Sequence, residues 1–297
     1  MIIMKLKGGL GNQLFQYACG RALTLDSGKK LVLDISRFDS HRRNETPWPY
    51  ALSDFHIKAQ VGLSPFQGRL LKASGKKRGL KKKIAQLLFP VTHVTEAGFV
   101  YQEAARATAL TGAYFFDGYW QSAKYFDHQR TALLDDLQLT QPLSARSQAL
   151  LDKISLSSSS VALHIRRGDY VTNASANAVH GTCTIDYYLN AMSHMENTFV
   201  APVFFVFSDD IEWAKSNLGN KHSMVFANYD QNVPAHEDMH LISACQHQVI
   251  ANSSFSWWGA WLNRNPDKIV IAPQKWFQDA KLDTRDLVPD AWVKISG

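Results

Sequence analysis

The sequence predicts an α/β protein with two domains. Its 297 residues are about twice the length of a typical domain of about 150 residues. In the second half, short apolar segments alternate with segments of helical spacing, a pattern typical of parallel sheets with crossover helices. The first residues begin in the same way, with an apolar strand, a glycine-rich loop and a helix.

The second half predicts five strands and four helices. The strands are expected at 161–165, 203–207, 224–226, 248–251 and 269–272, and the helices at 185–196, 211–218, 238–245 and 255–263. Such a sheet is covered on both faces, and its ligands bind at the carboxyl ends of the strands. The polar residues that directly follow each strand are therefore the candidate site residues.

The first half predicts strands at 2–6 and 31–35 and a helix at 14–25 that Gly28 ends. Beyond residue 40 the pattern blurs, and no elements are assigned. A serine run at 157–160 follows a polar stretch and precedes an apolar strand, which indicates a boundary near residue 155. We therefore expect an N-terminal domain at 1–154 and a C-terminal domain at 155–297.

The composition excludes a disordered chain, a collagen and a coiled coil. With 45% hydrophobic and 20% charged residues, the chain has an ordinary globular mixture. No uncharged apolar stretch reaches the roughly 18 residues that a spanning helix needs, and the apolar run at the N-terminus is too short for a signal peptide. Three widely spaced cysteines indicate a reducing cytoplasm rather than a disulfide framework. No metal-ligand motif occurs, so no metal site is expected.

The net charge of +6 comes from one segment. Residues 69–83 hold eight basic residues and no acidic one, and the rest of the chain has 24 basic and 26 acidic residues. This balance argues against a nucleic-acid-binding protein. Together with the leucine and isoleucine residues that extend to residue 88, the segment could form an amphipathic helix on an anionic membrane. The alternative is a solvated surface helix or loop.

The glycine loop at 8–13 follows the first predicted strand. It does not match the dinucleotide fingerprint, because Leu14 stands where the third glycine belongs. The loop presents two carboxamides, Asn12 and Gln13, which suit sugar hydroxyls or phosphate. A plain tight turn, with Asn12 as a helix cap, is the alternative.

Two arginines, Arg166 and Arg167, follow the predicted strand at 161–165. Successive residues of an extended segment point to opposite sides, so we expect one arginine to face the ligand and the other to pack away, on Asp169 for example. A guanidinium can hold a diphosphate through parallel hydrogen bonds. An internal ion pair is the alternative for either arginine. His164 either packs in the core or contacts a nucleotide.

Two further strand ends carry candidates. Asp209 follows the strand at 203–207 and could accept hydrogen bonds from a guanine or a ribose, or cap the next helix, whereas Asp210 is expected in the first helical turn. Ser253, Ser254 and Ser256 follow the strand at 248–251 and could cradle an anion with the helix amides. Taken together, the strand ends favour a nucleotide-sugar site.

Four motifs in order resemble the alpha-1,2-fucosyltransferases of glycosyltransferase family 11, above all the bacterial members. The motifs are GGLGNQLFQY at 8–17, HIRRGDY at 164–170, FSDD at 207–210 and NSSFSWWGA at 252–260, with GYWQS at 118–122 as a further segment. The resemblance implies a GT-B-type fold of two Rossmann-like domains with parallel sheets facing a cleft. It implies GDP-binding by the C-terminal domain and an acceptor side in the N-terminal domain.

The resemblance also implies the reaction. GDP-β-L-fucose would be the donor, transfer would be inverting and independent of metal, and the 2-hydroxyl of a terminal galactose would be the usual acceptor, in a glycan that could be lipid-linked. The arginine two residues after the motif histidine, here Arg166, would bind the diphosphate, and Asn12 and Gln13 would lie near the reacting sugar. Asp169, Asp117 and Glu237 are open candidates for a general base. Another GDP-sugar transferase, a non-catalytic sugar-binding protein and a membrane-surface scaffold are the rival hypotheses.

Overall fold

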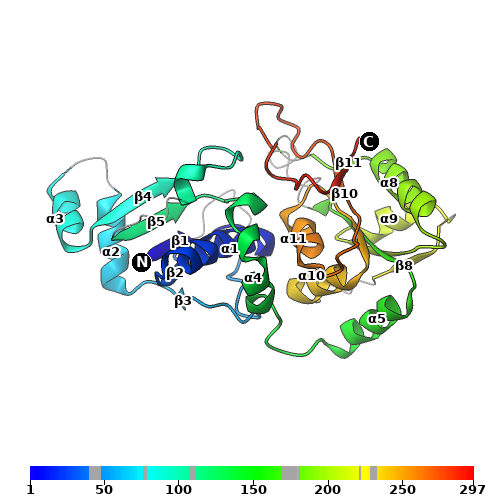
Figure 1. The fold of residues 1–297 in the computed structure, drawn as a ribbon, viewed down its shortest axis with the longest axis horizontal. Coiled ribbons are helices and arrows are strands. Elements are labelled where there is room, and N and C mark those ends of the chain that lie inside the picture. The colour runs from blue at the N-terminus through cyan, green and yellow to red at the C-terminus, as the bar shows by residue number, and fades with distance from the viewer. Residues whose placement is uncertain are drawn as a thin grey trace. The chain divides into compact units, whose positions relative to one another are not determined.

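The computed structural model describes residues 1–39, 48–75, 79–106, 112–168, 179, 181–220, 222–227 and 233–297. The chain divides into two compact units (Figure 1). Unit 1 comprises Met1–Thr140 and Arg285–Leu287, and unit 2 comprises Gln141–Thr284 and Val288–Gly297. Each unit contains one parallel sheet with helices, so the predicted α/β class is confirmed.

Unit 1 is built on a parallel sheet. Its described strands are β1 (Ile2–Lys5), β2 (Leu31–Asp34), β3 (Gln60–Val61), β4 (Val91–Thr95) and β5 (Ala113–Asp117), in the spatial order β3-β2-β1-β5-β4. Its described helices are α1 (Leu10–Ser27), α2 (Pro65–Ser74), α3 (Leu80–Leu88) and α4 (Arg130–Asp136), with short 3-10 turns at Glu103–Arg106, Ala123–Tyr125 and Asp127–Gln129. The central strand β1 leads directly into the glycine loop.

The first predicted helix begins earlier than expected. We predicted it at 14–25, but α1 starts at Leu10 with Gly9 as its N-cap, so the glycine loop is shorter than its sequence indicates. The helix ends as predicted at Gly28, which adopts a left-handed conformation with φ of 68°. α1 packs closely on β1, because a Cβ added at Gly20 would lie 2.4 Å from Met4.

Unit 2 contains a second parallel sheet. Its described strands are β6 (Ser160–Ile165), β7 (Val203–Ser208), β8 (Met224–Phe226), β9 (His247–Val249), β10 (Val270–Pro273) and β11 (Val293–Ile295). Its described helices are α5 (Ala145–Leu156), α8 (Ile185–Thr198), α9 (Ile211–Leu218), α10 (Ala235–Ala244) and α11 (Ser254–Leu262). All five predicted strands and all four predicted helices are present, and among the described elements of unit 2 α5 and β11 were not predicted from the pattern.

The strand order β11-β10-β9-β6-β7-β8 contains a reversal. The chain runs outward from β6 through β7 to β8, and then returns to the other side of β6 as β9. The helices cover opposite faces of the sheet: α8 and α9 pack on one core cluster, and α5 and α10 pack on another (Figure 1). Ligands of such sheets bind at this switch point, outside the carboxyl ends of the two central strands.

The boundary between the units differs from the predicted one. The chain passes from unit 1 to unit 2 at Thr140 and Gln141, not near residue 155. The serine run was misleading because α5, which precedes it, belongs to unit 2. Ile154 of α5 is buried in the core cluster with Leu241 of α10, and Glu237 of α10 accepts hydrogen bonds from Ser144 and Ser147 of the α5 N-terminus.

Within the described residues, no helix is both long and apolar enough to span a membrane.

Candidate active site

The switch point of unit 2 lies between β6 and β9. These strands pair in parallel, with Leu163 opposite Val249. Because β6 and β9 are parallel, the segments that start at Arg166 and Asn252 leave the sheet at the same edge and follow neighbouring strands. The structure thus brings together two of the segments that the sequence proposed, and the end of β7 adds the third on the other side of β6.

Each arginine forms an ion pair with a different aspartate after β7. Nη1 of Arg166 lies 3.0 Å from Oδ2 of Asp209, and their side chains are 25% and 26% exposed. Nε of Arg167 lies 3.2 Å from Oδ2 of Asp210. The two arginines therefore have separate partners, which agrees with the alternation of an extended segment.

The Arg167 side chain packs against residues of α9 and its N-cap. Its guanidinium lies 4.1 Å from the centre of the Trp213 ring on α9, a cation–π distance. Its partner Asp210 is the N-cap of α9 and accepts a hydrogen bond from Trp213 N–H at 3.1 Å. The expected partner Asp169 lies outside the described residues. Arg167 thus packs against α9, and the assignment of this side chain to the donor is not supported by its contacts.

Asp209 holds the turn after β6. Its Oδ1 accepts a hydrogen bond from the Arg167 backbone N–H at 2.8 Å, while its Oδ2 faces Arg166. A Cβ added at Gly168 would lie 2.6 Å from Asp209 Oδ2, so a glycine is needed for this close approach. The helix-cap alternative for Asp209 is wrong, because the neighbouring Asp210 is the cap and does not lie within the first turn.

His164 is buried beside these charges. The residue is 7% exposed, and its ring centre lies 5.5 Å from that of Phe255 on α11. Its Nδ1 has no hydrogen-bond partner among the described residues. Burial and the nearby Arg166 cation lower the pKa of His164 to about 3, so the imidazole is neutral at physiological pH. A neutral ring leaves one nitrogen to accept and one to donate.

The N-terminus of α11 lies at the end of β9. Ser253 is its N-cap, and the Ser253 hydroxyl accepts a hydrogen bond from Phe255 N–H at 3.3 Å. Ser254 is the first helical residue and is half-buried. The helix N-terminus offers backbone N–H groups and a partial positive charge to an anion.

The assignment of Ser256 as a ligand residue is corrected. Ser256 is fully buried, and its hydroxyl donates to the backbone carbonyls of Ala251 and Ser253 at 3.3 and 3.2 Å. Residues two positions apart in a helix point to nearly opposite sides, so Ser256 lies on the packed side of α11 when Ser254 does not. The predicted three-hydroxyl cradle therefore reduces to Ser253, Ser254 and the helix amides.

Asn252 contributes a supporting role that sequence reasoning missed. Its side-chain Nδ2 donates to the carbonyls of Gly181 and Trp276 at 3.2 and 3.1 Å, and the residue is 3% exposed. It therefore ties the end of β9 to two other loops. The position of Asn252 directly after a strand and before the serines could have indicated this role.

In unit 1 the glycine loop follows β1. Gly8 has φ of 78°, and a Cβ there would lie 2.5 Å from Nδ2 of Asn12. Asn12 lies inside α1, so it does not cap that helix. Its Oδ1 accepts a hydrogen bond from Nε2 of Gln121 at 2.6 Å, and Gln121 belongs to the 118–122 segment after β5. Two carboxamides from separate strand ends thus lie together at this edge.

The assignment of Gln13 as a reacting-sugar residue is corrected. Gln13 is fully buried, and its Nε2 donates to the carbonyls of Gly8 and Pro49 at 2.9 and 2.8 Å. Its Oε1 accepts a hydrogen bond from Ala51 N–H at 2.9 Å. With both ends of the carboxamide used, Gln13 anchors the glycine loop to the 49–51 segment.

The candidate general bases have structural partners. Asp117 at the end of β5 lies 2.6 Å from Nζ of Lys5 and 3.0 Å from Nζ of Lys7, and these hydrogen bonds lower its pKa despite the opposing effect of burial. Three hydrogen bonds from Ser144 and Ser147 likewise lower the pKa of Glu237 against burial. Low pKa values make both carboxylates weak bases. Asp169 lies outside the described residues.

A kinked segment follows Asp117. Trp120 is fully buried with φ of 58°, an uncommon conformation for a tryptophan, and Glu96 accepts hydrogen bonds from Tyr119 and Trp120 N–H at 2.6 and 2.8 Å. A Cβ added at Gly118 would meet Glu96 at 2.4 Å. Glu96 therefore holds the turn that presents Gln121, a role that sequence reasoning missed.

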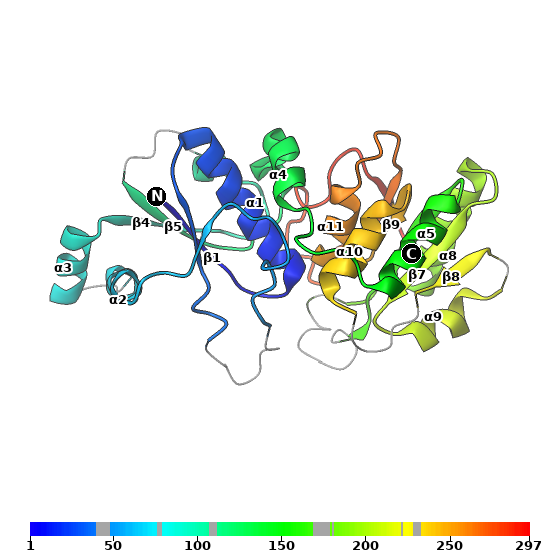
Figure 2. The same ribbon diagram turned by 90° about the horizontal axis from the view of Figure 1, so that it is seen from below.

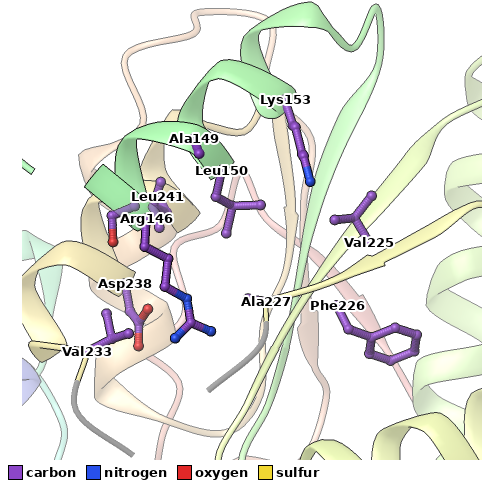
Figure 3. Close-up of a pocket in the computed structure, with 11 residues that line it drawn as sticks. Arg146, Ala149, Leu150, Lys153, Val225, Phe226, Ala227, Val233, Asp238 and Leu241 are labelled. Atoms are coloured by element: carbon purple, nitrogen blue, oxygen red, sulfur yellow. The ribbon is translucent and has the colours of Figure 1, made fainter. Parts of the chain in front are cut away.

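Unit 2 also contains a pocket of about 220 Å³ between α5, α10 and the end of β8 (Figure 3). Its wall is mainly apolar, with Leu150, Val225 and Leu241, while Arg146 points toward Asp238 (Figure 3). None of the predicted site residues lines this pocket. Among the described residues, no group of three or more His, Cys, Asp and Glu side chains is arranged to hold a metal ion.

The fold is that of a GT-B-type glycosyltransferase with two Rossmann-like domains. The structure aligns with the crystal structure of the fucosyltransferase NodZ from Bradyrhizobium with a TM-score of 0.52 and 14% identity, over 87% of this chain and 92% of that one. NodZ, an alpha-1,6-fucosyltransferase, has also been co-crystallised with GDP. At this identity the similarity concerns the fold.

The sequence comparisons give the family. Residues 56–296 match the family model described as Glycosyl transferase family 11, and the chain belongs to this family. It is 32% identical to an alpha-1,2-colitosyltransferase of Escherichia coli over 99% of both chains. It is also 32% identical to the O-antigen biosynthesis glycosyltransferase WbnK of Escherichia coli, over 98% of this chain and 99% of that one. The family resemblance inferred from the four motifs is confirmed.

Proposed function

We propose that the chain transfers L-fucose from GDP-β-L-fucose to the 2-hydroxyl of a terminal galactose, with inversion at the fucose C1. The observation that carries the donor side is the position of Arg166 at the switch point, beside the strand that leads into the α11 N-terminus. A guanidinium and a helix N-terminus at one edge form a site for a diphosphate. Family membership supports the sugar-transfer chemistry.

The proposed role of Arg166 is to stabilise the leaving group. When the bond between C1 and the phosphate oxygen breaks, negative charge grows on the diphosphate. Arg166, the Ser254 hydroxyl and the α11 amides would bind this charge, and no metal ion is required. One such preorganised donor typically contributes about 3–4 kcal/mol to the rate. Asp209 keeps the guanidinium at this edge before the donor arrives, and a guanidinium has donors for both a carboxylate and a phosphate oxygen.

The acceptor would be oriented by unit 1. Asn12 and Gln121 offer carboxamide groups that match sugar hydroxyls. The acceptor hydroxyl attacks C1 from the face opposite GDP, forms the new C–O bond as the bond to GDP breaks, and loses its proton to solvent or to a base. The natural acceptor would be a galactose-terminated glycan, in free or lipid-linked form.

Transfer of colitose is the second candidate, because one full-length relative is a colitosyltransferase. Colitose is L-fucose without the 3-hydroxyl, so the two donors differ in one polar group. A site that hydrogen-bonds the 3-hydroxyl would reject the deoxy sugar strongly, whereas an apolar surface at that position would accept both.

The test is a transfer assay with the purified chain and lactose. GDP-fucose, GDP-colitose and GDP-mannose are supplied in parallel, with and without EDTA, and the product is identified by mass spectrometry and its linkage by NMR. We expect a fucosylated trisaccharide with an α1,2 linkage, at an equal rate with EDTA. A higher kcat/KM for GDP-colitose would support the second candidate. GDP binding without transfer from any donor would support the non-catalytic hypothesis, and a loss of rate in EDTA would contradict metal independence.

A further inference from the structure

The basic segment 69–83 forms a helical hairpin rather than one amphipathic helix. α2 and α3 pack against each other and are joined by residues that include Gly75 and Gly79. Ser64 begins α2 with a capping box completed by Gln67. Leu71 of α2 is buried in a core cluster with Ile3, Val32, Val91 and Phe115, so α2 anchors the hairpin to the sheet of unit 1.

α3 has an exposed apolar stripe. Leu80, Ile84, Leu87 and Leu88 are 72%, 47%, 83% and 59% exposed, and their spacing of four, seven and eight residues places them on one helix face. The opposite face packs inward through Ala85, which is 1% exposed. Figure 1 and Figure 2 both show α3 at an edge of unit 1, beside α2. We call these four side chains the α3 stripe.

The stripe accounts for much of the exposed apolar surface. Among the described residues, ten large hydrophobic side chains are exposed, and six of them lie between Val61 and Leu88. A concentration of this kind marks an interaction surface, because scattered exposed apolar residues are the ordinary case. Unlike Leu71, the α3 stripe adds nothing to the core of unit 1.

The charge around the stripe is uniformly positive. Lys81 and Lys83 are exposed on the two flanks of the stripe, and Arg69 and Lys72 are exposed on α2. Residues 55–95 contain no Asp or Glu, and the sequence between the helices adds the basic residues 76–78. An apolar stripe flanked by lysines fits a bilayer interface, where the stripe enters the acyl boundary and the lysines meet anionic headgroups.

We propose that the α2–α3 hairpin binds the surface of an anionic lipid bilayer through the α3 stripe and its flanking lysines. The attachment is peripheral. It also leaves the strand-end residues of both units free of any direct role in membrane binding. The occupant is a lipid surface rather than an acidic protein, because four large aliphatic side chains without a polar group among them match acyl chains, and the lysines surround them.

Vesicle co-sedimentation tests this proposal. The full chain is mixed with vesicles of phosphatidylcholine alone, or of phosphatidylcholine with phosphatidylglycerol, at low and at high salt. We expect binding to the anionic vesicles that weakens at high salt. Leu87→Glu should lower the vesicle partition at least about tenfold, and replacing Lys81 and Lys83 by glutamine should lower it about fivefold per lysine.

Leu156→Glu is the matched control. Leu156 ends α5 and is 88% exposed, close to the 83% of Leu87, but it belongs to unit 2 and not to the basic segment. We expect this variant to bind vesicles like the wild type. Circular dichroism melting checks that all variants fold, and transfer to lactose should be unchanged in Leu87→Glu because the stripe touches no site residue.

Three outcomes would overturn the proposal: no binding of the wild type to anionic vesicles at low salt, equal losses in Leu87→Glu and Leu156→Glu, or a wild-type dimer that Leu87→Glu converts to a monomer in sedimentation velocity. The last result would identify a second copy of the chain as the occupant of the stripe. Binding that depends on the lysines and on Leu87 together supports a lipid surface.

Discussion

Each unit places two adjacent polar residues at the carboxyl edge of its central strand, and the two pairs differ in how the fold uses them. In unit 2, Arg167 packs on Trp213 and Asp210, while Arg166 pairs with Asp209. In unit 1, Gln13 is buried with both ends of its carboxamide bonded, while Asn12 meets Gln121. Arg167 and Gln13 therefore support their loops, whereas Arg166 and Asn12 remain at the edges of the sheets.

The residues that remain at the edge are charged in unit 2 and neutral in unit 1, and this difference favours different substrates at the two edges. Arg166 is a cation next to a helix N-terminus, which suits the diphosphate of a donor. Asn12 and Gln121 are neutral groups that both donate and accept, which suits the hydroxyls of a sugar. If the two edges bind different substrates, variants of the edge residues should differ in effect from variants of their packed neighbours.

The largest effect is expected for Arg166. Arg166→Ala should lower kcat by about 10²–10³-fold, because one preorganised donor to the departing diphosphate is lost. Arg166→Lys should recover only part of the rate, since an ammonium lacks the planar fork. Steady-state kinetics with GDP-fucose and lactose measure both variants.

Arg167→Ala is the control for this experiment. It removes a cation–π contact and a half-exposed ion pair, so the melting temperature should fall while kcat per folded molecule changes by less than about tenfold. Equal losses of kcat in the two variants would show that the arginines act together on the donor. A near-normal kcat in Arg166→Ala would remove the proposed role of Arg166.

The second prediction concerns pH and His164. The unfolded chain binds a proton at this residue near the ordinary pKa of 6.5, but the folded chain binds it only near a pKa of about 3. The unfolded state therefore holds more protons in this window, and stability falls as the pH decreases through it. Between about pH 7 and pH 5, His164 should cost about 1–2 kcal/mol of unfolding free energy.

Denaturant titrations of the wild type and His164→Gln at both pH values measure this cost. The loss of stability on acidification should be smaller in the variant. Carboxylates with lowered pKa values, such as Asp117 and Glu237, lose stabilising charge at low pH in both proteins. Their contribution therefore cancels when the loss of unfolding free energy in the variant is subtracted from that in the wild type. Parallel losses in the two proteins would mean that His164 titrates normally.

The accuracy of the sequence predictions followed the strength of the local pattern. The strands β6, β7 and β10 are mainly apolar and almost entirely buried, so their positions could be predicted directly from the pattern. β6, for example, spans 160–165 against a predicted 161–165. β11 was missed because Lys294 interrupts its three residues, whereas the equally short β8 is apolar throughout. The segment 69–88 was expected as an amphipathic helix or as a surface helix or loop, and it forms the two helices α2 and α3.

Residue type located the candidate segments along the chain, but it did not show which of their side chains are buried. The sequence placed candidates after the strands that the structure shows as β6, β7 and β9. Both arginines form ion pairs, and the donor role of Arg166 stays a prediction. The sequence did not separate Asn12 from Gln13, or Ser254 from Ser256. In these helical pairs the buried member is set by tertiary contacts, such as those of Gln13 with Pro49 and Ala51, which are distant in sequence.

Asn12 and Gln13 allow the same kind of test on the acceptor side. Asn12→Ala should lower kcat/KM for lactose about tenfold, the cost of one or two lost hydrogen bonds, and should leave the GDP Kd unchanged. Gln121→Ala should have a similar effect because its carboxamide is hydrogen-bonded to that of Asn12.

Gln13→Ala is the control and should instead lower the melting temperature, since the loss of its carboxamide leaves buried backbone groups of the loop unpaired. Calorimetry with GDP is the discriminating measurement, and a weaker GDP affinity in Asn12→Ala would show that the two edges do not divide the substrates.

The smallest effects are expected within the serines of α11, and they test the orientation argument directly. Ser256→Ala removes a buried hydroxyl that bonds to the carbonyls of Ala251 and Ser253, so the unfolding free energy should fall by about 0.5–1.5 kcal/mol with kcat unchanged. Ser254→Ala changes a half-buried hydroxyl at the first position of the helix, so stability should stay close to the wild type while kcat falls several-fold. The two variants remove the same atom from residues two positions apart, so sequence distance cannot explain a difference between them. If Ser256→Ala loses activity and Ser254→Ala does not, the diphosphate meets α11 on its other side, and Arg166 would need a different set of partners at the switch point.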